Sequence, residues 1–104
     1  MSASRASNAY YDAEIATFIG TTSDAVLGRI VANYAFAVDP EQRDAWLTEI
    51  EVLKDVLAGV EGTIFLEFNV PRIGSRIDAV LISGPTIFAI EFKVGEKHFK
   101  RDDI

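Results

Sequence analysis

Apolar residues recur at helical spacing through the first third of the chain. They form two stripes that advance in steps of three and four residues, the spacing that places side chains on one face of a helix. The first stripe consists of Tyr11, Ile15, Phe18 and Ile19, and the second of Leu27, Ile30, Val31 and Tyr34. We therefore predict two helices within an N-terminal helical segment, residues 1–38, with Ser23 as a candidate N-cap for the second.

A third helix is marked by its N-terminal sequence. Asp39 is a good N-cap, Pro40 suits the first helical position, and Gln42 stands where a capping box has its third residue. An apolar stripe then repeats at intervals of four, three and four residues, at Trp46, Ile50, Leu53 and Leu57. We expect Trp46 to be a core residue, because such a stripe usually faces the core. Gly59 is placed to end this helix.

After Gly62 the apolar pattern changes from helical to alternating, which is typical of strands. Three strands are expected, and they cover residues 63–70, 76–82 and 86–93. In the first of them, alternation places Ile64, Leu66 and Phe68 on one face and Phe65, Glu67 and Asn69 on the other. Helices followed by strands predict an α+β fold with a three-stranded antiparallel meander, in one domain whose residues 39–104 form an αβββ unit.

Composition and charge narrow the functional class. With 49% hydrophobic residues and no cysteine, the chain is globular and has neither disulfides nor a thiolate zinc site, so we expect a cytoplasmic protein. A net charge of -6 argues against sequence-independent binding of nucleic acid through an excess of lysine and arginine. Residues 1–68 hold 4 Lys and Arg against 11 Asp and Glu, whereas residues 69–104 hold 6 against 5. If an anionic ligand binds, it is therefore expected at the C-terminal third.

The hairpin across "SGPT" brings distant charges together. A symmetric loop centred on its Gly-Pro pair fixes the register of the two strands, whereas a three-residue loop would shift it. In the symmetric register Asp78 faces Glu91 and Arg76 faces Lys93, on one face of the sheet and with Cβ atoms about 5 Å apart. Two facing carboxylates repel each other, and a hard cation such as Mg²⁺ between them would remove the repulsion.

Such a cluster suits metal-assisted hydrolysis of a phosphodiester. Lys93 would orient or deprotonate a metal-bound water, or neutralise charge that develops on the phosphate. The alternative is a salt-bridged patch on a solvent-facing surface, in which Asp78 and Glu91 pair with Arg76 and Lys93.

"RID", followed by twelve residues and "EFK", resembles the active-site signature of the PD-(D/E)XK nuclease superfamily. The preceding helix and three strands match the α-β-β-β opening of that superfamily's restriction-endonuclease-like fold. The stretch from "LEFNVPRIGSRIDAVLI" to "IFAIEFKVGEKHF" resembles, more specifically, the nuclease-type domain found ahead of helicase-like ATPase domains in some bacterial and phage-related proteins. The resemblance covers roughly residues 41–100.

The resemblance implies a role for each residue of the signature. Asp78 and Glu91 would be the metal-ligating carboxylates and Lys93 the catalytic lysine. The backbone carbonyl of Phe92 would join them around Mg²⁺ or Mn²⁺. Several members add a glutamate from the helix before the sheet.

Further candidates surround that signature. For the helix glutamate the candidate is Glu49, with Glu51 as the alternative, and Glu67 on the neighbouring strand could serve instead. The candidates for phosphate contact are Arg72, Arg76 and Lys97; the alternative is that these are ordinary surface charges.

Two departures from the superfamily pattern bear on activity. Ile77, rather than proline, precedes Asp78. The superfamily's fold continues with a second core helix and a fourth strand, whereas this chain stops at Ile104, so the expected core is incomplete at its C-terminus. An inactive nuclease-fold module that binds nucleic acid or protein, or an oligomerisation domain, is therefore the alternative function. Expected partners are DNA rather than RNA, a second copy of the chain, and a helicase-like ATPase domain outside these residues.

Overall fold

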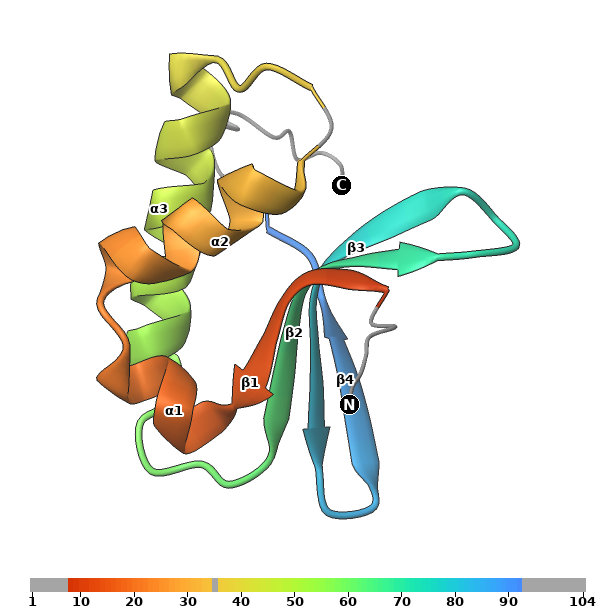
Figure 1. The fold of residues 1–104 in the computed structure, drawn as a ribbon. Coiled ribbons are helices and arrows are strands. Elements are labelled where there is room, and N and C mark those ends of the chain that lie inside the picture. The colour runs from red at the N-terminus through yellow and green to blue at the C-terminus, as the bar shows by residue number, and fades with distance from the viewer. Residues whose placement is uncertain (1–7, 35, 93–104) are drawn as a thin grey trace, which may run out of the picture.

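The structure is a computed structural model that describes residues 8–34 and 36–92. Its elements follow the order β1 (Ala9–Glu14), α1 (Ile15–Gly20), α2 (Ser23–Asn33), α3 (Pro40–Val56), β2 (Thr63–Val70), β3 (Ser75–Ser83) and β4 (Thr86–Ile90). The predicted α+β class is confirmed, and the described strands form one antiparallel sheet in the order β1-β2-β3-β4 (Figure 1). Among the described helices, none has the length and apolar character that a membrane crossing requires.

The N-terminal segment corrects the prediction that three helices precede all of the strands. Residues around Tyr11 form β1, which pairs antiparallel with β2, and the first helix begins only at Ile15. The step from Tyr11 to Ile15 fits a helix, but β2 would otherwise present an unpaired edge, and pairing with β1 satisfies its backbone groups. The Ile15 N–H donates to the Gly62 carbonyl at 2.8 Å, which fixes the junction between β1 and α1. The described sheet therefore has four strands.

The helix caps follow the sequence closely. The side chain of Thr22, rather than that of the predicted Ser23, caps α2 by accepting a hydrogen bond from the Ala25 N–H at 3.2 Å. Asp39 caps α3 as predicted, since its Oδ1 accepts from the Gln42 N–H at 2.9 Å. Each cap satisfies one of the unpaired N–H groups at the start of its helix.

One core lies between the three described helices and a single face of the sheet. The register aligns Tyr11 with Leu66 and Ala79, and Ile64 with Leu81, so that these five side chains share that face. The helices contribute Ile15 and Phe18, Val26, Leu27 and Ile30, and Trp46, Ile50, Leu53 and Leu57. Trp46 is thus a core residue, as predicted, and all of these side chains are buried.

The hairpin between β3 and β4 has the predicted register. Ser83 pairs with Thr86 and the ladder continues to Ala79 and Ile90, although β4 ends three residues before the predicted 93. The Phe92 N–H donates to Asp78 Oδ2 at 2.7 Å, so a side chain takes the place of a ladder carbonyl beyond Ile90.

The sheet changes direction at Glu67. This residue has a φ of +56°, in the left-handed region, and it is absent from the ladder although Leu66 pairs with Ala79 and Phe68 with Ile77 on either side. The predicted alternation is therefore wrong at this point. Glu67 is buried next to buried Leu66, and the Phe68 ring comes to lie 6.0 Å from that of Phe65. Beyond the break, the ends of β2 and β3 form a hairpin that projects away from the helices (Figure 1).

Candidate functional site

Three carboxylates converge where the sheet changes direction. Glu49 comes from α3, Glu67 from β2 and Asp78 from β3, and one carboxylate oxygen from each lies within 4.8 Å of the others. Glu67 is only 7% exposed, whereas Glu49 and Asp78 are half-buried. Three elements that are distant in sequence thus present carboxyl groups to one small volume.

The local structure explains why the three side chains meet. Glu49 directly precedes Ile50 and lies three residues after Trp46, so it borders the buried stripe of α3. The registers on either side of Glu67 place it opposite Asp78. Because of its left-handed backbone, Glu67 departs from the alternation of β2 and becomes buried.

Hydrogen bonds hold two members of the cluster. The Trp46 side chain donates to the Glu67 carboxylate, and Arg76 Nη1 lies 3.7 Å from Glu67 Oε1. Asp78 accepts from the Phe92 N–H. These contacts fix the orientation of Glu67 and Asp78 and engage only part of the acceptor capacity of the two carboxylates.

Electrostatics disfavours full ionisation of the cluster. Burial, followed by the charges of Asp78, Glu67 and Glu91, raises the pKa of Glu49 to about 8. Burial and then Asp78 raise the pKa of Glu67 to about 7, although Arg76 and the hydrogen bond from Trp46 oppose this shift. At neutral pH the metal-free cluster therefore retains protons that ordinary carboxyl groups would have lost.

This donor set fits a hard divalent cation. Mg²⁺ and Mn²⁺ prefer oxygen ligands, and closely spaced carboxylates provide them. A bound cation would favour the ionised forms of Glu49 and Glu67, because its charge opposes both burial and mutual repulsion.

The remaining predicted site residues lie at different places. Glu91 follows β4 and is exposed, and its charge contributes to the raised pKa values of Glu49 and Glu67, so it acts on the cluster without belonging to the closest group. Glu51 is exposed on α3 and is also outside that group. Arg72 is exposed in the turn of the β2–β3 hairpin. Lys93 and Lys97 lie outside the described residues.

Tyr10 is a neighbour of the cluster that the sequence patterns did not predict. The guanidinium of Arg76 lies 5.1 Å from the centre of the Tyr10 ring, so Arg76 contacts both β1 and Glu67. The sequence predicted no site role for Tyr10, because the apolar spacing placed its segment in a helix. The adjacent aromatic pair "YY" is typical of a strand and was the one available signal.

No family model matches the chain, and the comparisons with curated proteins and with solved structures found no match either. The chemistry of the carboxylate cluster and the sequence signature that contains Asp78 are therefore the basis for inferring a function.

Proposed function

We propose that this protein is a metal-dependent nuclease-like domain that hydrolyses phosphodiester bonds in nucleic acid, with DNA as the preferred substrate. The observation that carries this proposal is the convergence of Glu49, Glu67 and Asp78 within 4.8 Å. The middle residue of the "EFK" triplet lies beside them, since the Phe92 N–H donates to Asp78. A buried, hydrogen-bonded carboxylate group of this kind is costly unless a cation compensates it.

Within this proposal, Asp78 and Glu91 hold Mg²⁺ or Mn²⁺ together with the carbonyl of Phe92, and Glu49 or Glu67 adds a further oxygen. The bound metal supplies Lewis-acid polarisation of the phosphate and a water of lowered pKa. Lys93 would orient or deprotonate the attacking water; the water oxygen would form the new bond to phosphorus as the bond to the ester oxygen breaks, and the leaving oxygen would take a proton from solvent.

Phosphate contacts complete the proposed site. Arg76 is the best-placed cation among the described candidates, because it already lies 3.7 Å from Glu67. Arg72 and Lys97 would contact phosphates farther along the strand. The order α3, β2, β3, β4 supports a restriction-endonuclease-like core, to which β1 adds a strand at one edge.

Cleavage assays with labelled single- and double-stranded DNA and RNA in Mg²⁺ or Mn²⁺ test the activity. We expect the full chain to cleave DNA. Asp78→Asn and Lys93→Ala should each reduce the rate by at least about a hundredfold, since metal ligation and proton transfer each contribute that much. Thr86→Ala, at the exposed start of β4, is the control and should cleave normally. Equal cleavage by Lys93→Ala and the parent chain would refute the catalytic assignment.

A second candidate function, oligomerisation of a nuclease-fold module, is favoured by β4. This strand lies at the edge of the described sheet and contains neither a charged residue nor a proline, the usual protections of an exposed edge. Ile87 is 69% exposed and Phe88 is 48% exposed. We therefore propose a second copy of this chain as a partner through β4. A helicase-like ATPase partner is proposed on the sequence resemblance alone, and a cytoplasmic location on the absence of cysteine.

A further inference from the structure

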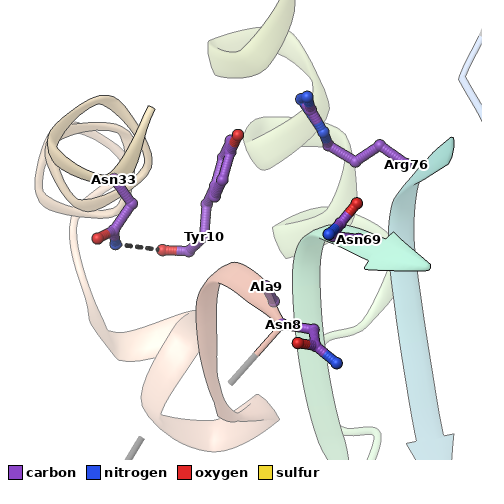
Figure 2. A pocket seen from close by; sticks show the side chains of 6 residues that line it. All are labelled: Asn8, Ala9, Tyr10, Asn33, Asn69 and Arg76. Carbon is purple, nitrogen blue, oxygen red and sulfur yellow. Dashed lines mark hydrogen bonds between the residues drawn. The ribbon is translucent and has the colours of Figure 1, made fainter. Parts of the chain in front are cut away.

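A polar pocket adjoins the carboxylate cluster. It has a volume of about 400 Å³ and is lined by Asn8, Ala9, Tyr10, Asn33, Asn69 and Arg76 (Figure 2). The lining includes all three asparagines of the chain. Its volume is within the range of roughly 300–1,000 Å³ that is usual for small-molecule sites. Arg76 is shared between this pocket and the cluster, because it contacts Glu67.

The sheet aligns one side of the pocket with the cluster. Asn69 pairs with Arg76 across β2 and β3, and the Asn69 N–H donates to the Asn8 carbonyl at 2.8 Å. These three residues therefore form a row across neighbouring segments, and Figure 2 shows the Asn69 carboxamide between Asn8 and Arg76. Glu67 lies two residues before Asn69 along β2, and Asp78 lies two residues after Arg76 along β3. The pocket is thus two residues along the strands from the cluster.

The three asparagines differ in their hydrogen bonding. Both donors of Asn33 are used, since its Nδ2 donates to the Tyr10 carbonyl at 2.8 Å and to the Arg29 carbonyl at 3.1 Å. Asn33 therefore fixes β1 against α2. The carboxamides of Asn8 and Asn69 make no hydrogen bond to any residue that the structure describes. Each of them offers both a donor and an acceptor to a ligand.

Tyr10 and Arg76 provide a stacking surface. The guanidinium lies over the Tyr10 ring at 5.1 Å, and it is held from the side by Glu67. The Tyr10 ring in turn meets the Tyr34 ring edge-on at 6.0 Å. A guanidinium plane fixed in this way can stack on a planar ligand with its other face.

We propose that this pocket binds one unpaired nucleobase of the polynucleotide substrate. The base stacks on Arg76, and its edge forms hydrogen bonds with the carboxamides of Asn69 and Asn8. This inference rests on the proposed nuclease function and names its substrate class: nucleic acid with a single-stranded segment or end. Unpaired bases are typically recognised by stacking on aromatic or arginine planes together with hydrogen bonds to their edges.

The charges around the pocket favour a base over a phosphate. Its one cationic side chain, Arg76, is already close to the Glu67 carboxylate, which offsets its charge. The free carboxamides are neutral and present donors and acceptors in fixed directions, as a base edge requires. A duplex would present bases whose pairing edges are already engaged, so the pocket discriminates against it.

Fluorescence anisotropy provides the test, as a double-mutant cycle between protein and nucleic acid. The full chain and its Asn69→Ala variant are each titrated in Ca²⁺ with a labelled single strand and with a fully abasic strand of equal length, which retains every phosphate. We expect Asn69→Ala to weaken binding of the base-bearing strand by about tenfold, the value of one good hydrogen bond, and to leave the abasic strand unaffected. Thr86→Ala is the polar-to-alanine control and should change neither affinity.

Equal weakening on both strands would overturn the inference, because it would indicate a phosphate contact. An unchanged affinity for the base-bearing strand, or no binding of any strand, would overturn it as well. Cleavage in Mg²⁺ is measured separately. If Asn69→Ala loses affinity only for the base-bearing strand and the parent chain cleaves nothing, the base-binding pocket is supported and the nuclease function is refuted. Cleavage that requires Lys93, combined with no effect of Asn69→Ala on binding, would support the nuclease function and refute the base-binding pocket.

Discussion

Glu67 determines the character of the site at the scale of single residues. A non-glycine residue with a φ of +56° costs on the order of 1–3 kcal/mol, and a buried carboxylate adds a desolvation cost. The Trp46 side chain and Arg76 partly compensate that cost. Strained residues of this type gather at functional sites, where the surrounding structure enforces them. The strain and burial of Glu67 therefore lower stability, and they support the proposed metal site.

The raised pKa values of Glu49 and Glu67 predict the pH dependence of stability without metal. Both values, about 8 and about 7, lie above the ordinary 4.5, so the folded state binds more protons than the unfolded chain in this window. We therefore expect the free energy of unfolding, measured by urea denaturation with a chelator, to fall as pH rises from about 5 to about 8. Mg²⁺ should stabilise more at the upper end of that range, because it binds ionised carboxylates.

A matched pair of variants on α3 isolates this effect. Glu49→Gln removes one of the two raised groups and should flatten the fall in stability. Glu51→Gln removes an exposed carboxylate from the same helix and should leave the fall unchanged. Identical pH profiles for the two variants would show that Glu49 does not carry the raised pKa.

At the scale of elements, β1 and α3 differ in how far the sequence specifies them. For α3, the Asp39 cap, Pro40 and the apolar stripe at Trp46, Ile50 and Leu53 all agree, and the helix forms where predicted. For β1, the local spacing favoured a helix, yet the segment pairs with the open edge of β2 and forms a strand. Local propensity is a weak signal for a short segment, and a partner that is distant in sequence overrides it.

The role of β1 in the core predicts the effect of a truncation at Tyr11. This side chain is 3% exposed between Leu66 and the helices. We expect Tyr11→Ala to lower the free energy of unfolding by about 3 kcal/mol or more, as for other large-to-small changes in a core. Asp12→Ala, which alters an exposed residue of the same strand, should stay within about 0.5 kcal/mol. Equal, small effects in urea denaturation would mean that β1 does not pack as described.

At the scale of the whole molecule, helices cover one face of the sheet, and exposed apolar residues lie on the other face. By register, Ile82 and Ile87 share the face that the helices do not cover, and they are 37% and 69% exposed. Together with the uncharged edge of β4, this surface favours association of two copies. The three residues of the carboxylate cluster come from α3, β2 and β3, and none of them belongs to β4.

Light scattering at micromolar concentration tests this association. We expect the mass of two chains for the parent protein and of one chain for Ile87→Lys, because a lysine on an edge strand opposes pairing. Ile73→Lys is the matched control, since Ile73 is 73% exposed in the turn of the β2–β3 hairpin. It should retain the parent mass. A parent mass of one chain would contradict the proposed partner.

The sequence by itself determined α3, the three C-terminal strands and the register of the last hairpin. These features depend on contacts between near neighbours: a cap, an apolar stripe, an alternating run and a Gly-Pro turn. Continued by one further pair, that register predicted that Asp78 faces Glu91 and suggested a metal site; the observed ladder ends at Ala79 and Ile90. Only the tertiary structure decided that β1 is a strand, that Glu67 leaves the alternation of β2, and that Glu49 reaches Asp78. Each of these depends on a partner distant in sequence, which no local pattern encodes.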